Sequence, residues 1–159
     1  TNVPHVHAVG DCAELRAGDG KNRIEQLWYT GRMHGEVLGR VLAGEPATYD
    51  RGIWFNSAKF LDLEYQTYGL VKMDVPGEKN LFWRARDGLH AMRLVYTDES
   101  VIGFNSLGIR YRHRTCERWI REKRSVEYVM ANLPEANFDP EFFARHEREM
   151  VRTWKEQLA

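Results

Sequence analysis

Residues 81–97, with the sequence LFWRARDGLHAMRLVYT, contain the pattern that decides the fold. Two runs rich in apolar residues, Leu81–Arg86 and Leu89–Thr97, flank the dipeptide Asp87-Gly88. Asp-Gly is typical of the tight turns that join antiparallel strands, because both residues tolerate the backbone conformation that such turns need. The stretch therefore predicts a β-hairpin.

The sequence on either side extends this hairpin into a sheet. Residues 63–69 (LEYQTYG) alternate in a way that is typical of a half-buried strand. A turn is expected around Val75-Pro76-Gly77, and Asp98-Glu99 precedes a further apolar run, Val101–Phe104. The connections are too short for crossover helices, so we predict a meander of about four strands, all antiparallel. Residues 49–57 are expected to form an irregular connection before it.

The last third of the chain has helical patterning. One or two helices are predicted, broken at Ser125 and ended by Pro134. Asp139-Pro140-Glu141 predicts the start of a final helix, because a capping residue precedes a proline at the first helical position. The apolar positions assigned to these helices are Cys116, Trp119, Ile120, Val129, Met130, Leu133, Phe142, Phe143, His146, Met150 and Trp154.

The amino-terminal segment is organised differently, as one strand and one helix. Val3–Val9 predicts a short buried strand that ends at a turn, Gly10-Asp11. A helix is predicted from Asn22, with Glu25 completing a capping box, to a stop at Gly44. Glycine inside a helix costs about 1 kcal/mol relative to alanine, so the helix glycines predict close approach of a backbone or a flat ligand. The predicted apolar face comprises Ile24, Leu27, Trp28, Gly31, Gly35, Leu38 and Leu42.

The composition is that of a folded domain. With 159 residues, 43% of them hydrophobic, the chain can form one domain or a small domain with an appendage. Its 23 Lys and Arg balance 23 Asp and Glu, so no net charge attracts nucleic acid or an acidic membrane. No signal segment and no apolar stretch of about 20 residues is present, so we expect a cytoplasmic protein. Because the chain begins with Thr1, we expect it to be processed or a piece of a longer protein.

Asp11 is the first candidate for a binding residue. It follows a predicted buried strand and precedes a helix, and ligands of open α/β sheets bind beyond the carboxyl ends of strands. A carboxylate there accepts a hydrogen bond from a ligand hydroxyl, and the start of the helix favours electron-rich groups. The alternative is that Asp11 only caps the loop.

The residues Thr1–Asp11, TNVPHVHAVGD, resemble the second flavin-binding motif of the pyridine nucleotide-disulfide oxidoreductase family. Cys12-Ala13 and the predicted helix up to Gly44 resemble the segment that comes after that motif in the family. The resemblance implies that Asp11 hydrogen-bonds the ribityl chain of FAD and that backbone amides at the helix start approach the flavin ring. The cofactor-binding residues implied are Gly10, Asp11, Gln26 and Leu27, and none is implied to be catalytic.

The resemblance also implies a domain organisation and partners. Residues 1–44 would end a Rossmann-type FAD-binding domain, and residues 45–159 would form an interface domain, which together make an α+β chain. Gly18-Asp19-Gly20 lacks the third glycine of a dinucleotide fingerprint, so the FAD and NAD(P) domains are expected upstream. The parent is then an FAD-dependent oxidoreductase that takes hydride from NAD(P)H. The abundant aromatic residues of this chain, together with its resemblance to the family, predict that the parent forms a homodimer.

Two other functions remain open from the sequence. The chain is alternatively a freestanding, non-catalytic interaction or dimerisation module. The basic segment Arg110–Arg124 could alternatively grip RNA or phosphate, although a solvated helix face with charge pairs is the commoner explanation for such a segment.

The cysteines and histidines predict no metal site. Cys12 lies near a helix start, where a thiol can be a nucleophile, but the preferred interpretation is a small buried residue. Cys116 is assigned to the core. The pairs His5/His7 and His113/Cys116 each offer two ligands without a visible third.

Overall fold

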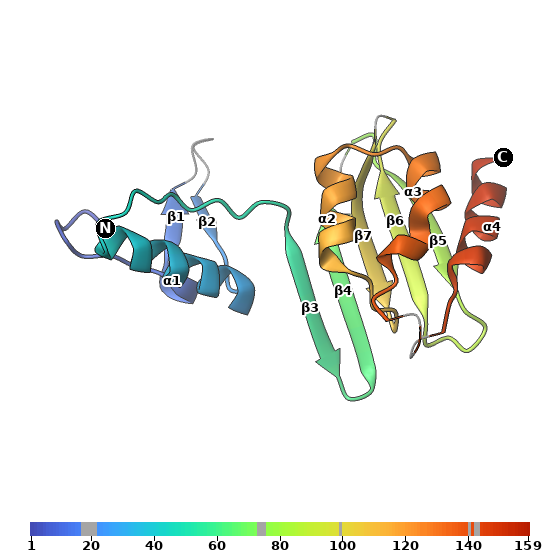
Figure 1. Cartoon of the computed structure of the whole chain (residues 1–159), viewed down its shortest axis with the longest axis horizontal. Helices are drawn as coiled ribbons and strands as arrows, with labels where there is room; N and C mark the ends of the chain where they lie inside the picture. The colour runs from blue at the N-terminus through green and yellow to red at the C-terminus, as the bar shows by residue number, and fades with distance from the viewer. Residues whose placement is uncertain (17–21, 73–75, 99, 140, 142–143) are drawn as a thin grey trace. The chain divides into compact units, whose positions relative to one another are not determined.

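Figure 1 shows the computed structural model of the chain, which describes residues 1–16, 22–72, 76–98, 100–139, 141 and 144–159. The chain divides into two compact units, Thr1–Gly52 and Ile53–Ala159. Residues 17–21, which include Gly18-Asp19-Gly20, the first residue of the turn at 75–77, and the predicted helix positions Phe142 and Phe143 fall outside the described residues.

The second unit contains a sheet of five strands in the order β3-β4-β7-β6-β5, and every neighbouring pair is antiparallel. The strands are β3 (Phe55–Phe60), β4 (Leu63–Gly69), β5 (Lys79–Arg84), β6 (Ala91–Tyr96) and β7 (Val101–Leu107). The predicted antiparallel sheet is confirmed. The irregular connection predicted up to residue 57 is partly wrong, because β3 begins at Phe55; this strand lies at the edge of the sheet and is only partly buried, so its sequence lacks a strong alternation.

The hairpin predicted at Asp87-Gly88 is confirmed. Strands β5 and β6 pair with Leu81 opposite Leu94 and Trp83 opposite Met92, and all four side chains are buried. The Asp87 carboxylate accepts hydrogen bonds from the backbone N–H groups of Leu89 and His90, at 2.8 and 3.3 Å. The aspartate therefore stabilises the turn with its side chain.

The strand order differs from a simple meander, because β4 pairs with β7 and not with β5. The chain that leaves β4 runs directly over β7, and the Leu70 N–H donates to the Ile102 carbonyl at 2.8 Å. A Cβ atom on Gly103 would lie 2.0 Å from the Leu70 carbonyl oxygen. Glycine at position 103 is therefore required for this crossing.

Helices cover one face of the sheet, as Figure 1 shows. They are α2 (His113–Arg121), α3 (Val126–Asn132), the 3₁₀ turn η2 (Leu133–Ala136) and α4 (Glu147–Leu158). The predicted break at Ser125 is confirmed, since its hydroxyl caps α3 by accepting from the Tyr128 N–H at 3.3 Å. The core between sheet and helices contains the fully buried Trp83, Trp119, Trp154, Tyr68, Tyr111 and Phe104.

The predicted start of the last helix is wrong. Helix α4 begins at Glu147, and residues 144–146 are not helical. Glu147 is buried and accepts a hydrogen bond from the Asn137 side chain at 2.9 Å, which fixes the first turn at this position. Met150 and Trp154 are buried, as predicted.

The first unit comprises a 3₁₀ turn η1 (Gly10–Cys12), strands β1 (Glu14–Arg16) and β2 (Asn22–Ile24), and helix α1 (Trp28–Leu42). The strand predicted at Val3–Val9 is not formed in this chain, because its residues are exposed and pair with no strand among the described residues. Asn22 is not a helix cap: residues 22–24 pair with β1, and α1 starts only after Leu27.

The predicted end of α1 is confirmed. The N–H groups of Gly44 and Glu45 donate to the carbonyls of Val41 and Arg40, at 3.0 and 2.9 Å, which is the Schellman pattern. The predicted apolar face is wrong, since the buried residues of α1 are Thr30 and His34. No helix in the part of the chain that the structure describes has the length and apolar character for crossing a membrane.

Candidate functional site

A pocket of about 500 Å³ opens where the η1 turn meets the start of α1 in the first unit. It is lined by Gly10, Asp11, Leu27, Trp28, Gly31 and Arg32. Three of the four residues predicted to bind the cofactor are thus brought together. The fourth, Gln26, is exposed and does not line the pocket.

The Gly10 turn presents Asp11 to solvent. Gly10 has φ +78°, a conformation that favours glycine, and its carbonyl accepts from the Ala13 N–H at 3.0 Å. Asp11 is exposed, and among the described residues its carboxylate has no hydrogen-bond or ion-pair partner. It is therefore available to accept a hydrogen bond from a ligand.

The start of α1 supplies the opposite side of the pocket. The first helical hydrogen bond runs from the Gly31 N–H to the Leu27 carbonyl at 2.9 Å, and no side chain caps the helix start. Such a start carries partial positive charge. A Cβ on Gly31 would lie 3.9 Å from the Gly10 Cα, so turn and helix are in contact, whereas nothing described lies within 4 Å of a Cβ on Gly35.

Trp28 and Arg32 are pocket residues that the sequence reasoning missed. The Trp28 side chain is 71% exposed, in contrast to its predicted place on a packed apolar face. The Arg32 guanidinium lies 6.0 Å from the Trp28 ring centre and pairs with Glu36 at 2.7 Å. A cation four residues after an aromatic residue on a helix is the pattern that could have indicated this pair.

A buried polar cluster lies next to the pocket. The Gly10 N–H donates to Nδ1 of His34 at 3.1 Å, and His34 is 4% exposed. Glu25 is also buried and accepts hydrogen bonds from Tyr49 at 2.5 Å and Arg51 at 3.0 Å. Burial, with the Glu25 carboxylate as the next cause, raises the pKa of Tyr49 far above its usual range. Glu25 therefore does not serve as the capping-box residue that the sequence pattern predicts.

The two cysteines have different surroundings. Cys12 is exposed, so the preferred expectation of a buried residue is wrong, and its thiol lies 3.5 Å from the Val9 carbonyl. Cys116 is buried, as predicted, and burial raises the pKa of its thiol. Across the described ranges, no group of three or more His, Cys, Asp or Glu residues could hold a metal ion.

Four of the seven basic residues in the segment Arg110–Arg124 form ion pairs. The Glu64 carboxylate accepts hydrogen bonds from two guanidinium nitrogens of Arg110, one of them at 2.5 Å. The other pairs are Arg118–Glu135, Arg121–Glu117 and Arg124–Glu122. This is the solvated, charge-paired helix face that the sequence offered as the commoner explanation.

Comparison with known proteins gives relatives of one kind. No protein-family model matches the chain. The chain is 28% identical over 145 residues to a ferredoxin–NAD(P)(+) reductase of Sphingomonas sp., a match that covers 87% of this chain and 34% of that protein. The chain spans about a third of that relative's length.

Two solved structures have a similar fold. A NAD-dependent persulfide reductase from A. fulgidus matches with a TM-score of 0.66 and 16% identity over 96% of this chain and 31% of that one. A FAD-dependent pyridine nucleotide-disulphide oxidoreductase from Desulfovibrio vulgaris matches with a TM-score of 0.63 and 19% identity over 98% of this chain and 40% of that one. The chain is thus similar to a portion, between 30% and 40%, of each of these proteins.

Proposed function

We propose that this chain is the carboxy-terminal part of an FAD-dependent NAD(P)H oxidoreductase. Residues 1–44 end its FAD-binding domain, and residues 45–159 form its interface domain. The relatives support this proposal, because the chain matches about a third of each and they include a ferredoxin–NAD(P)(+) reductase and a FAD-dependent oxidoreductase. The FAD and NAD(P) domains upstream are its first partners.

The single observation that carries the proposal is the unpaired Asp11 carboxylate in a pocket with an uncapped helix start. Asp11 accepts a hydrogen bond from a ribityl hydroxyl of FAD. The first N–H groups of α1, after Gln26 and Leu27, approach the electron-rich edge of the flavin ring. The Gly10 turn holds both features at one site, so the available groups fit the polyol chain and the ring of this cofactor.

The flavin, when bound, supplies the hydride chemistry with NAD(P)H as donor. The residues of this chain bind and orient it. Asp11 fixes the ribityl chain, and the exposed Trp28 indole and Arg32 border the space that remains in the pocket. No residue of this chain is assigned a proton or hydride transfer.

The exposed amino-terminal stretch supports a strand that needs partners from upstream. Val3, Val6 and Val9 are 51%, 49% and 38% exposed, respectively. In a parallel sheet of the FAD domain, neighbouring strands would pair with Val3–Val9 and bury these side chains. We propose that this stretch becomes the predicted Rossmann strand in the complete protein.

We also propose a homodimer formed by the second unit. Phe60 and Phe82 are 67% and 50% exposed, and exposed aromatic side chains are enriched at protein interfaces. The molecular mass of the complete gene product in solution tests this directly, and a monomer would contradict it.

The experiment that tests the flavin contact compares Asp11→Ala with Asp62→Ala in the complete gene product. Asp62 lies in the exposed turn between β3 and β4, so it is a matched control for loss of an aspartate. A hydrogen bond to a charged acceptor contributes roughly 1.5–3 kcal/mol, so Asp11→Ala should weaken FAD binding about tenfold or more. Equal FAD dissociation constants in the two variants would refute the assignment.

A freestanding interaction module is the second candidate function. It is favoured by the complete aromatic core of the second unit, in which Trp83, Trp119 and Trp154 are at most 2% exposed. The reading frame upstream of Thr1 decides between the two. A GxGxxG strand-turn-helix there supports the oxidoreductase, and a nearby start codon supports the module.

A further inference from the structure

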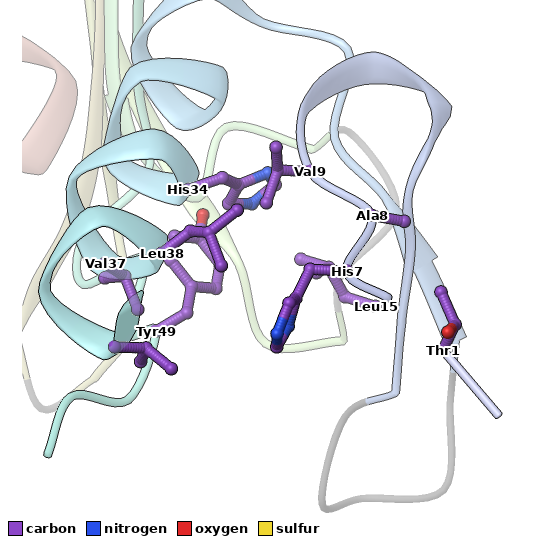
Figure 2. Close-up of a pocket in the computed structure, with 10 residues that line it drawn as sticks. Thr1, His7, Ala8, Val9, Leu15, His34, Val37, Leu38 and Tyr49 are labelled. Carbon is purple, nitrogen blue, oxygen red and sulfur yellow. The ribbon is translucent and has the colours of Figure 1, made fainter. Parts of the chain in front are cut away.

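His34 is a buried histidine that the proposed flavin contact does not use. Its side chain is 3% exposed and projects from α1 toward the amino-terminal stretch, beside Val9 (Figure 2). It also borders a second pocket, of about 220 Å³, whose other walls include Val37 and Leu38. A buried imidazole at this place needs a structural or functional reason.

The hydrogen bond from the Gly10 N–H defines the state of this ring. Because Nδ1 accepts from the backbone at 3.1 Å, the proton of the neutral ring is on Nε2. Nε2 is buried and has no hydrogen-bond partner among the described residues. The nearest acidic oxygen is Oε2 of Glu25, at 3.8 Å. The carboxylate therefore favours the tautomer that leaves Nδ1 free to accept.

Glu25 is itself held in place. Tyr49 and Arg51, which lie close to the end of the first unit in sequence, both donate to its carboxylate. The Tyr49 ring also packs edge-on against the His34 ring, with the ring centres 4.3 Å apart. The His34 ring is thus held by its packing against Tyr49 as well as by its hydrogen bond with Gly10.

We infer that His34 is a positioning residue, which holds the Gly10 amide and thereby sets the place of Asp11 beside the start of α1. This inference rests on the proposed function, because the position of Asp11 affects cofactor binding only if this chain contributes to an FAD site. The residues before Gly10 are exposed and contribute little packing, so the partly buried hydrogen bond to His34 has a large share in fixing the turn. Loss of the acceptor would let Asp11 move away from the ligand and weaken binding.

The test uses three variants of the complete gene product. His34→Phe keeps a ring and removes the acceptor, whereas His34→Asn places an amide oxygen near the position of Nδ1 and keeps it. Val37→Ala is the control, one turn further along α1 and without polar contact to the turn. If His34→Phe does not fold, His34→Leu also lacks an acceptor and replaces it. Two quantities are measured: the FAD dissociation constant and the hydrogen exchange of peptides that contain Gly10.

We expect His34→Phe to bind FAD about tenfold more weakly and to exchange the Gly10 amide faster. His34→Asn and Val37→Ala should remain within about threefold of the unchanged protein in affinity. Unchanged affinity in His34→Phe, with stoichiometric FAD in the unchanged protein, would overturn the inference and leave the proposed function standing. If the unchanged protein binds no FAD, the proposed function fails, and the Gly10 exchange alone decides: unchanged exchange in His34→Phe overturns the positioning role.

Discussion

The two units of the chain differ in whether their large apolar side chains are buried or exposed. In the second unit, Trp119 and Trp154 are fully buried between sheet and helices. In the first unit, Trp28 and Leu42 are 71% and 69% exposed, and the buried residues of α1 are Thr30 and His34. The second unit has its own apolar core. In the first unit, by contrast, polar side chains are buried and large apolar side chains are exposed. This contrast is what we expect if the first unit belongs to a larger domain.

The largest effect that separates the units is expected from tryptophan truncation. Trp119→Ala should lower the free energy of unfolding by about 3–5 kcal/mol, because it leaves a cavity in a close-packed core. Trp28→Ala, the matched change in the first unit, should alter it by less than about 0.5 kcal/mol. Denaturant unfolding of the 159-residue chain checks both. Equal losses would show that the two units do not differ in this way.

The glycines give a second, smaller contrast. Gly103→Ala places a methyl group 2.0 Å from the Leu70 carbonyl and should destabilise the second unit by about 1–3 kcal/mol. Gly35→Ala has open space around it in the described structure and should stabilise α1 by up to about 1 kcal/mol. Thermal unfolding of the chain measures both shifts.

The effect of Gly35→Ala on stability can also be compared between the isolated chain and the complete gene product. If upstream residues pack against this side of α1, the substitution should become destabilising there while it stays favourable in the isolated chain. The same stabilising effect in both proteins would argue against packing of an upstream domain at Gly35.

The smallest effect is expected at the basic helix face of the second unit. Arg118 and Glu135 pair at 3.0 Å, but both side chains are about half exposed, at 52% and 50%. Arg118→Ala should therefore change the free energy of unfolding by less than about 0.5 kcal/mol. Binding to a short polyanion should also be unaffected by Arg118→Ala, and a clear loss of such binding would revive the phosphate-binding alternative.

The parts of the fold that could be predicted depend on local patterns. The hairpin at Asp87-Gly88 and the cap at Ser125 are decided by adjacent residues, so the sequence alone indicates them. The strand at Val3–Val9 depends on pairing partners, and none is present among the described residues. The pairing of β4 with β7 depends on contacts between residues far apart in the chain, such as Gly69 opposite Gly103.

The candidate site was predictable to the same extent. Gly10 and Asp11 could be found because they lie in a motif, and Leu27 because the family resemblance implies a backbone contact near the amino end of the helix. The pocket brings these three residues together. The contacts of His34 with Gly10 and of Tyr49 with Glu25 each span 24 positions in the sequence. Periodicity and capping rules act over a few residues and do not indicate such pairs.

The central claim is that this chain completes a flavin site whose larger part lies upstream. The most direct measurement is the flavin absorbance of the purified complete gene product beside that of the isolated chain. Our account predicts stoichiometric FAD in the complete gene product and little or none in the isolated chain. Stoichiometric flavin in the isolated chain, or none in the complete gene product, would contradict it.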